Sequence, residues 1–286
     1  MAFYTVNPTE ELVDPVVITA YDGWVDSGSA ATTAAKLLAG TGRILVEFDA
    51  DQLFDFRARR PVLEIQDGRL ERLTWPALTM RVREIGKRSV IVLTGSEPDF
   101  HWRRYSTEVV ELAKRFGVRE WISLGAIPAA VPHTRAVPIL GTASRPGLLR
   151  ADVTAGPQGL LRVPAACLSV VDMAIAAAGI SAVGYFAQTP HYVSGDYPGA
   201  AQELLRVVGR HLDIEPPIGD LADEARALRT RLDTAASLDE HTRSYVERLE
   251  GMVDESRQPV GDDLIADIER FLRDQGSEMG GGGRPN

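Results

Sequence analysis

The strongest constraint on the fold is a regular alternation of short apolar runs with helical patterns. The apolar runs are rich in β-branched and aromatic residues and occupy residues 16–20, 44–48, 90–94, 121–124 and 180–186. Amphipathic or alanine-rich helical patterns lie between them at about 28–39, 101–116, 158–178 and 197–211. Strands that alternate with helices are typical of a sheet covered on both faces. The sequence therefore predicts an α/β protein whose three-layer α/β/α core contains a mostly parallel sheet.

A hairpin interrupts this alternation at residues 62–75, VLEIQDGRLERLTW. Asp67-Gly68 suits the positive φ angles of a type I′ turn between two short strands. An isolated two-stranded hairpin is marginal in water, so its apolar side chains are expected to be buried by a neighbouring subunit or by the same chain. These side chains are Val62, Leu63, Ile65, Leu70, Leu73 and Trp75.

Charge divides the chain into two parts. Residues 1–212 hold 22 acidic and 22 basic side chains, whereas residues 213–286 hold 18 acidic and 9 basic, which accounts for the net charge of −9. We expect a core domain at 1–212, an acidic helical cap at 213–276 and a flexible tail at 277–286. The acidic part argues against nucleic acid or anionic membranes as partners, because phosphate contacts need clustered Lys and Arg.

Several features predict a cytoplasmic protein. Cys167 is the single cysteine, lies in an apolar stretch and cannot form an internal disulfide, which indicates a reducing compartment. The first residues lack the basic and apolar segments of a secretory signal. The longest apolar run, 163–180, contains Asp172, so it is expected to be a buried helix rather than a membrane span.

Unusual residues follow the expected strands, where ligand and partner sites of α/β sheets gather. The candidate cleft or binding residues are Asp22, Trp24, Asp26, Ser27, Glu97, Trp102, His133, Thr134, His191 and Tyr192. The stretch GWVDSGSA at 23–30 has the glycine spacing of a phosphate loop, but Ser29 stands where the lysine belongs. Asp22 and Asp26 would also repel a phosphate, so these carboxylates are expected to cap the following helix.

No catalytic residue, metal site or cofactor is predicted. Ser27 could pair with His133 or His191, yet the chain has no G-x-S-x-G elbow to orient a nucleophile. Both histidines follow prolines and are expected to bind loop backbone. The histidines show no metal-ligand spacing. An arginine cluster, Arg57, Arg59 and Arg60, is expected to pair locally with Asp49, Asp51 and Asp55 and to orient the hairpin.

An ordered set of motifs resembles a known family. The motifs are GWVDSGSAA (23–31), DFRARRP (55–61), GSEPDFHW (95–102), LGAIPAAVPHTR (124–135), GPQGLL (156–161), PHY (190–192) and YPGAAQELL (197–205). Over about residues 15–211 the chain resembles the family named after the second subunit of the proteasome assembly chaperone, in its longer, actinobacterial-type form.

The resemblance implies a core similar to purine nucleoside phosphorylases and related hydrolases, and C-terminal helices over the strand ends. It also implies a homotrimer whose contacts include the hairpin residues Val62, Ile65, Leu70, Leu73 and Trp75. Eukaryotic and archaeal relatives help to assemble or bind the proteasome, so proteasome subunits are possible partners. Archaeal relatives dock through a C-terminal tyrosine motif, whereas this chain ends GGRPN.

We therefore expect a protein-binding assembly factor without chemistry of its own. Two alternatives stay open from the sequence. One is a hydrolase or phosphorylase-like enzyme that acts on a small molecule in a cleft under the helical lid, and the other is a ligand sensor. Convergence of the strand-end carboxylates and histidines in one closed pocket would favour the enzyme.

Overall fold

The computed structural model describes residues 2–150, 153–157 and 159–257. It divides into a compact unit that ends at Ala235 and a second unit that begins at Ala236, and the two are described separately. The first unit contains the sheet and extends past the expected boundary at residue 212. Among the described residues, no helix combines the length and the apolar character needed to cross a membrane.

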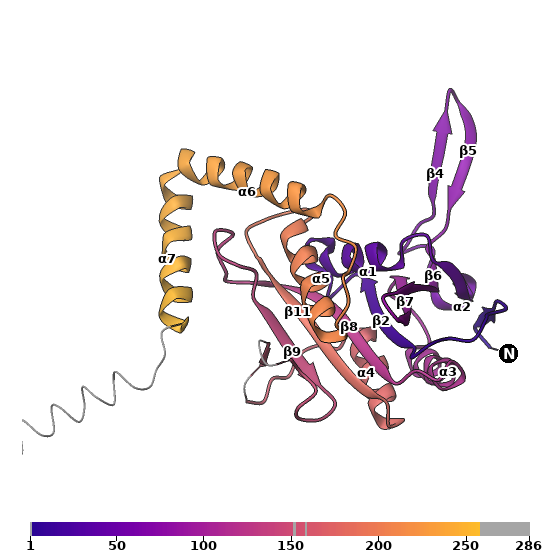
Figure 1. The fold of residues 1–286 in the computed structure, drawn as a ribbon. Coiled ribbons are helices and arrows are strands. Elements are labelled where there is room, and N and C mark those ends of the chain that lie inside the picture. Colours follow the sequence, from indigo (N-terminus) through magenta and orange to yellow (C-terminus); the bar gives the residue numbers. More distant parts are fainter. Residues whose placement is uncertain (1, 151–152, 158, 258–286) are drawn as a thin grey trace, which may run out of the picture. The chain divides into compact units, whose positions relative to one another are not determined.

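A nine-stranded sheet forms the centre of the first unit, in the order β1-β3-β6-β7-β2-β8-β11-β9-β10 (Figure 1). Its strands are β1 (Tyr4–Val6), β2 (Val16–Asp22), β3 (Arg43–Phe48), β6 (Leu78–Ile85), β7 (Arg88–Ser96), β8 (Glu120–Ala129), β9 (Ile139–Ala143), β10 (Thr154–Ala155) and β11 (Ser181–Pro190). The four central strands, β7, β2, β8 and β11, are parallel. The predicted parallel sheet is thus its centre, and antiparallel pairing of β1, β3, β6 and β9 makes the whole sheet mixed.

Outside this parallel centre, β3 was predicted as the apolar run at 44–48, whereas β1, β6, β9 and β10 were not predicted. In β6, the side chains of Leu78, Met80 and Val82 are buried, and the residues between them are partly exposed. This period of two is a strand signal. Arg81 and Arg83 at the partly exposed positions concealed it, because the predicted strands were chosen as continuous apolar runs.

Helices cover both faces of the sheet, as predicted for a three-layer core. They are η1 (Ser27–Ser29), α1 (Ala30–Ala39), α2 (Ala50–Leu53), α3 (Trp102–Arg115), α4 (Cys167–Ala177), α5 (Pro198–Leu212), α6 (Leu221–Leu238) and α7 (Glu240–Arg257). Helices α1 and α5 pack together on one face, and α3 and α4 pack together on the other. Alanines in α1 are fully buried, so small side chains let this helix lie close to its neighbours.

Helix α4 is shorter than the predicted helix at 158–178. It begins at Cys167, and residues 160–166 form no helix. Pro164 explains the difference, because proline lacks a backbone N–H group and disfavours helical geometry in the residue before it. The apolar side chains of Leu160, Leu161 and Val163 in this segment are largely exposed.

The predicted hairpin forms as β4 (Val62–Gln66) and β5 (Arg69–Thr74), a separate two-stranded sheet that projects from the core (Figure 1). Asp67 and Gly68 have φ angles of 51° and 77°, as a type I′ turn requires. All residues of both strands are exposed. Within the described part of the chain, no segment buries these two strands, and burial by a neighbouring subunit stays a prediction.

The segment 213–276, predicted to be helical, contains α6 and α7, and its part from residue 258 and the predicted tail at 277–286 lie outside the described residues. Leu221 of α6 belongs to the buried core on the α1 and α5 side of the sheet, and Leu228 and Leu232 pack against that core. This apolar stripe explains why the first unit continues to Ala235.

Asp172 on α4 is held against β8. Its Oδ1 atom accepts hydrogen bonds from Trp121 Nε1 (3.1 Å) and from the Ser123 hydroxyl. Burial raises the pKa of this carboxyl to about 7, although both hydrogen bonds act in the opposite direction. The aspartate within the apolar run thus lies in a helix of the core, beside partners that its sequence position did not reveal.

We expect Asp172→Asn to stabilise the protein above neutral pH. The ordinary carboxyl pKa is about 4, and the pKa of Asp172 in the folded state is about 7. At pH values between these two, the folded state binds more protons than the unfolded state, so the protein loses stability as pH rises. Asparagine keeps the Oδ1 acceptor and carries no charge. Denaturant unfolding should give the variant and the wild type the same free energy of unfolding near pH 4. At pH 8 the variant should be more stable by on the order of 2 kcal/mol, a value reduced from the full effect of the pKa shift because the side chain is partly exposed.

Asp196→Asn, at an exposed carboxylate, is the matched control and should leave the pH profile unchanged. Parallel profiles for Asp172→Asn and the wild type would contradict the account.

Candidate functional site

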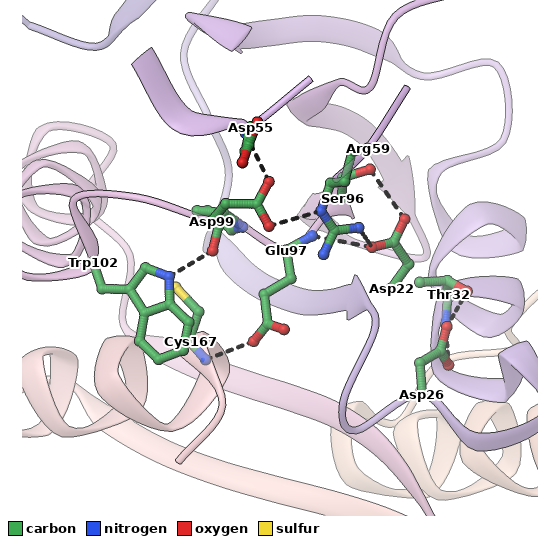
Figure 2. Close-up of polar contacts among 11 residues, drawn as sticks. Asp22, Asp26, Thr32, Asp55, Arg59, Ser96, Glu97, Asp99, Trp102 and Cys167 are labelled. Atoms are coloured by element: carbon green, nitrogen blue, oxygen red, sulfur yellow. Dashed lines mark hydrogen bonds and ion pairs between the residues drawn. The ribbon is translucent and has the colours of Figure 1, made fainter. Parts of the chain in front are cut away.

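The candidate site lies where the parallel central strands end. Asp22, the last residue of β2, is level with Ser96, the last residue of β7. The turn at 23–26 and the loop at 97–101 leave the sheet from these two residues. Figure 2 shows the side chains that connect them. The parallel register therefore brings two of the family-like motifs, which are more than 70 residues apart in sequence, to one edge of the sheet.

An ion-pair cluster of Asp22, Arg59 and Asp99 connects the hairpin base to this edge (Figure 2). Arg59 Nη1 lies 2.8 Å from Asp22 Oδ1, and Arg59 Nε lies 3.1 Å from Asp99 Oδ1. Burial alone would lower the pKa of Arg59, but hydrogen bonding to Asp99 and the charge of Asp22 outweigh it and raise the pKa. Arg59 therefore stays charged between two carboxylates.

This cluster corrects the predicted role of Arg59. The sequence suggested local ion pairs with Asp49, Asp51 or Asp55, whereas the observed partners come from β2 and from the loop before α3. The carboxylate of Asp99, which the sequence analysis did not single out, also accepts the backbone N–H of Asp55 (2.9 Å). Sequence separations of 37 and 40 residues gave no signal for these contacts.

Asp22 holds backbone and hydroxyl groups of the neighbouring loop. Its carboxylate accepts the Glu97 N–H (3.1 Å) and the Ser96 hydroxyl (3.0 Å) (Figure 2). The prediction that Asp22 caps the following helix is therefore wrong, because the 95–99 loop and Arg59 use its oxygens instead.

Glu97 and Trp102 fix the next segments in a similar way. Glu97 Oε1 accepts the backbone N–H of Cys167 (2.7 Å) at the start of α4, and Trp102 Nε1 donates to the Pro98 carbonyl (2.5 Å) (Figure 2). Burial, together with the negative charge of Glu97, raises the pKa of the Cys167 thiol. This environment favours an unreactive, protonated thiol.

Asp26 caps the start of α1, as the sequence predicts. Oδ1 accepts the backbone N–H groups of Ala31 (2.8 Å) and Thr32 (3.2 Å), and Oδ2 accepts the Thr32 hydroxyl (2.5 Å) (Figure 2). Burial raises the pKa of Asp26 despite these hydrogen bonds. The carboxylate reaches further than an ordinary N-cap because η1 separates it from the helix.

The turn after Asp26 is fixed to two other elements. Ser27 Oγ lies 2.7 Å from Thr189 Oγ1 on β11, and the Gly28 carbonyl accepts the Tyr197 N–H (2.9 Å) before α5. Gly28 has a φ of 63°, and a Cβ atom there would lie 2.7 Å from Tyr197 Cβ. Glycine is therefore required by both the backbone angle and the close approach of Tyr197.

His133 is buried among polar partners on the connection after β8. The Tyr192 hydroxyl lies 2.8 Å from its backbone nitrogen and 2.7 Å from Nδ1, and Asp233 Oδ1 lies 3.2 Å from Nε2. Because the tyrosine oxygen accepts the backbone N–H, its own proton is available for Nδ1, and Nε2 can then donate to Asp233. Asp233, on α6, had no signal in the sequence.

The other candidates have different surroundings. His191 binds the Ala129 backbone, with Nδ1 3.0 Å from the carbonyl oxygen, as expected of a histidine in a proline-restricted loop. Thr134 follows His133 and is partly buried. Trp24 is 67% exposed at the turn after β2, where it can contact a partner.

Three groups that the enzyme alternative would use have structural partners. Ser27 bonds to Thr189, Asp26 to the start of α1, and His133 to Tyr192 and Asp233. Within residues 2–257, with the gaps at 151–152 and 158, no group of three or more His, Cys, Asp or Glu side chains is arranged to hold a metal ion. The carboxylates at the strand ends mainly hold loop backbone, and this arrangement builds a rigid surface.

A family model described as the PAC2 family matches residues 20–236. No curated protein matches the sequence.

Solved structures of similar proteins come from actinobacteria and archaea. A protein of unknown function from Corynebacterium glutamicum is 26% identical with a TM-score of 0.85, and the match covers 91% of this chain and 99% of that one. The proteasome-assembly chaperone homologue Rv2125 of Mycobacterium tuberculosis is 33% identical with a TM-score of 0.74, over 81% and 99% of the two chains. PbaB of Pyrococcus furiosus, an archaeal proteasome activator, is 14% identical with a TM-score of 0.64, over 81% and 97%, which shows a shared fold.

We expect Arg59→Met to destabilise the protein by about 1–3 kcal/mol, between the values for exposed and buried ion pairs. The substitution leaves Asp22 and Asp99 without their shared cation. Denaturant unfolding measures the loss, and hydrogen exchange should show faster opening of the 97–99 loop. Arg57→Met, at an exposed arginine two residues away, is the matched control and should change stability little. Equal effects of the two substitutions would contradict the proposed role of the cluster.

Proposed function

Because the chain belongs to the PAC2 family, we propose that it is an assembly-chaperone-like protein that acts by binding other protein chains. The motif resemblance to this family is confirmed by the family match. The relative Rv2125 is described as a proteasome-assembly chaperone homologue. The strand-end carboxylates hold loops, which supports a role as a rigid binding surface rather than as a catalyst.

The observation that carries this proposal best is the exposed hairpin. Ile65, Leu70 and Leu73 are 61%, 72% and 47% exposed. Contiguous exposed apolar side chains on a soluble protein commonly mark a binding surface. We take a second copy of this chain as the occupant, because the family resemblance implies that the hairpin contacts another subunit.

Pairing within the hairpin defines which face binds. Leu63 pairs with Leu73, and Ile65 pairs with Leu70 after a register shift between Glu64 and Ile65. Cross-strand partners share a face, so these four residues form one apolar face, which we call the hairpin apolar face. Glu64 and Arg72 form an ion pair at 2.6 Å on the other face.

Two residues of the predicted contact set lie elsewhere. Strand alternation places Val62, opposite Thr74, on the face of Glu64. Trp75 follows β5, and its ring packs against Phe56 with centroids 4.8 Å apart. The proposed subunit contact therefore centres on Leu63, Ile65, Leu70 and Leu73.

Finer features implied by the resemblance remain part of the proposal. They are the homotrimer, the cytoplasmic location, the core similar to purine nucleoside phosphorylases and proteasome subunits as the partner. The small-molecule enzyme stays an untested alternative.

We expect the double substitution Ile65→Ser and Leu70→Ser to convert the oligomer to monomer. It removes apolar area that only another copy would bury, so folding of the monomer should persist. Light scattering after size exclusion measures mass, and circular dichroism checks the fold. Val62→Ser, on the opposite face, is the matched control and should leave the oligomer intact. An oligomer that survives the double substitution would overturn the assigned contact.

We further expect the purified protein to form a complex with separately expressed proteasome subunits of the same organism. Native mass spectrometry would detect the complex, and a rise in the rate of assembly of the proteolytic particle would show chaperone activity. No complex and no change in assembly rate would contradict the chaperone role, whatever the outcome for the hairpin.

A further inference from the structure

A cavity of about 150 Å³ lies between α4 and the neighbouring strands β11 and β9. Much of its lining consists of small residues, namely Ala143, Ala176, Ala182 and Gly184. It is smaller than the roughly 300–1,000 Å³ of sites for drug-sized ligands, so it suits a ligand of a few heavy atoms. None of the strand-end candidate residues is among its described lining residues, so it is separate from the candidate site.

Gly184 keeps the floor of this cavity open. It lies within β11, level with Thr142 of β9. A Cβ atom at Gly184 would lie 2.6 Å from Thr142 Oγ1 and 2.8 Å from Phe186 Cε2, so a larger residue would occupy this space. Glycine inside a strand weakens the strand, and it often marks a place where a ligand or another chain segment approaches closely.

Asp172 is the one ionisable residue among the described lining residues. Its Oδ1 atom accepts hydrogen bonds from Trp121 and Ser123 on β8, and these two bonds fix the carboxyl group. Within the described part of the chain, no group donates to Oδ2, and no arginine, lysine or histidine pairs with this carboxylate. A largely buried carboxylate without a counter-ion is costly, so a cation bound beside it would stabilise its charged form.

The rest of the lining provides neutral acceptors and apolar surface. Ser144 Oγ accepts the backbone N–H of Ala182 (3.1 Å) and has capacity for a second hydrogen bond. Thr142 contributes another hydroxyl group from β9. Met173 is 77% exposed at the α4 side, and its flexible thioether side chain can adapt to an apolar body. The lining thus suits a ligand with a cationic donor at one end and a few carbon atoms at the other.

We propose that this cavity binds a small primary amine as its ammonium ion, with the charged head at Asp172 and a short alkyl body against Ala176 and Met173. The ammonium ion supplies the counter-ion that the described residues do not provide. Its three N–H groups match the carboxylate and hydroxyl acceptors of the lining. This inference goes beyond the chaperone role and does not depend on it.

The test uses full-length protein and three probes with the same four-carbon chain: butylammonium, butanol and butyrate. Ligand-observed NMR titrations at pH 8 and constant ionic strength measure binding. We expect saturable binding of butylammonium, binding of butanol weaker by about tenfold or more, and no binding of butyrate, because only the cation makes a charge-assisted hydrogen bond. Absence of saturable butylammonium binding, or equal binding of butanol or butyrate, would overturn the proposal.

Substitutions locate the binding site. Asp172→Asn should weaken butylammonium binding about tenfold and leave butanol binding unchanged. Asp196→Asn is the matched control, because it removes the same charge from an exposed residue that does not line the cavity. Equal weakening by the two substitutions, or none by Asp172→Asn, would overturn the assignment.

A third substitution tests the cavity itself. Ala176→Leu adds a larger side chain to the α4 wall and leaves the carboxylate in place, so it should abolish butylammonium binding. If this variant fails to fold by circular dichroism, Ala143→Leu makes the same test from the β9 side. Unchanged binding by a folded variant of this kind would contradict binding in this cavity.

The pH dependence of binding provides a second readout. The pKa of Asp172 is about 7 in the free protein, and an alkylammonium ion stays charged up to about pH 10. Butylammonium should therefore bind about tenfold more tightly at pH 8 than at pH 6, because the carboxyl group must first lose its proton. Trp121, Ser123 and the β9 hydroxyl groups do not titrate, and burial raises the pKa of the Tyr21 phenol far above this range. An affinity independent of pH, or the same pH dependence in Asp172→Asn, would overturn the role of this carboxylate.

Discussion

The parallel register of β7, β2 and β8 is the constraint on which the candidate surface depends. Because Val16 of β2 is level with Val90 of β7 and with Glu120 of β8, these strands present their carboxyl ends at one edge. The loops that leave this edge carry backbone N–H groups without strand partners. Each such group needs an acceptor when water is excluded, and the nearby carboxylates supply it.

This requirement explains why carboxylates at a sheet edge need not indicate catalysis. Asp22, Asp26 and Glu97 each accept at least one backbone N–H from another segment. A carboxylate used in this way fixes a loop and has fewer lone pairs for a substrate. Arg59 then balances charge at Asp22 and Asp99. The result is a set of loops with defined positions, which suits recognition of a protein surface.

The sequence predicted features that depend on local chemistry. The type I′ turn at Asp67-Gly68 and the cap by Asp26 follow from residue preferences over a few positions, and the central strands follow from continuous apolar runs. It did not predict the partners of Arg59 or the contact between His133 and Asp233, which lie 100 residues apart. Such contacts depend on how the helices and strands pack together, and the local residue patterns of a single sequence do not indicate that packing. It missed β6 because alternating arginines masked an apolar period of two.

The position of α6 connects these observations. Leu221 of this acidic segment is buried in the core, and Leu228 and Leu232 pack against it. The same helix brings Asp233 to His133. Apolar contacts therefore set where α6 lies, and its charged side chains determine which groups it meets there.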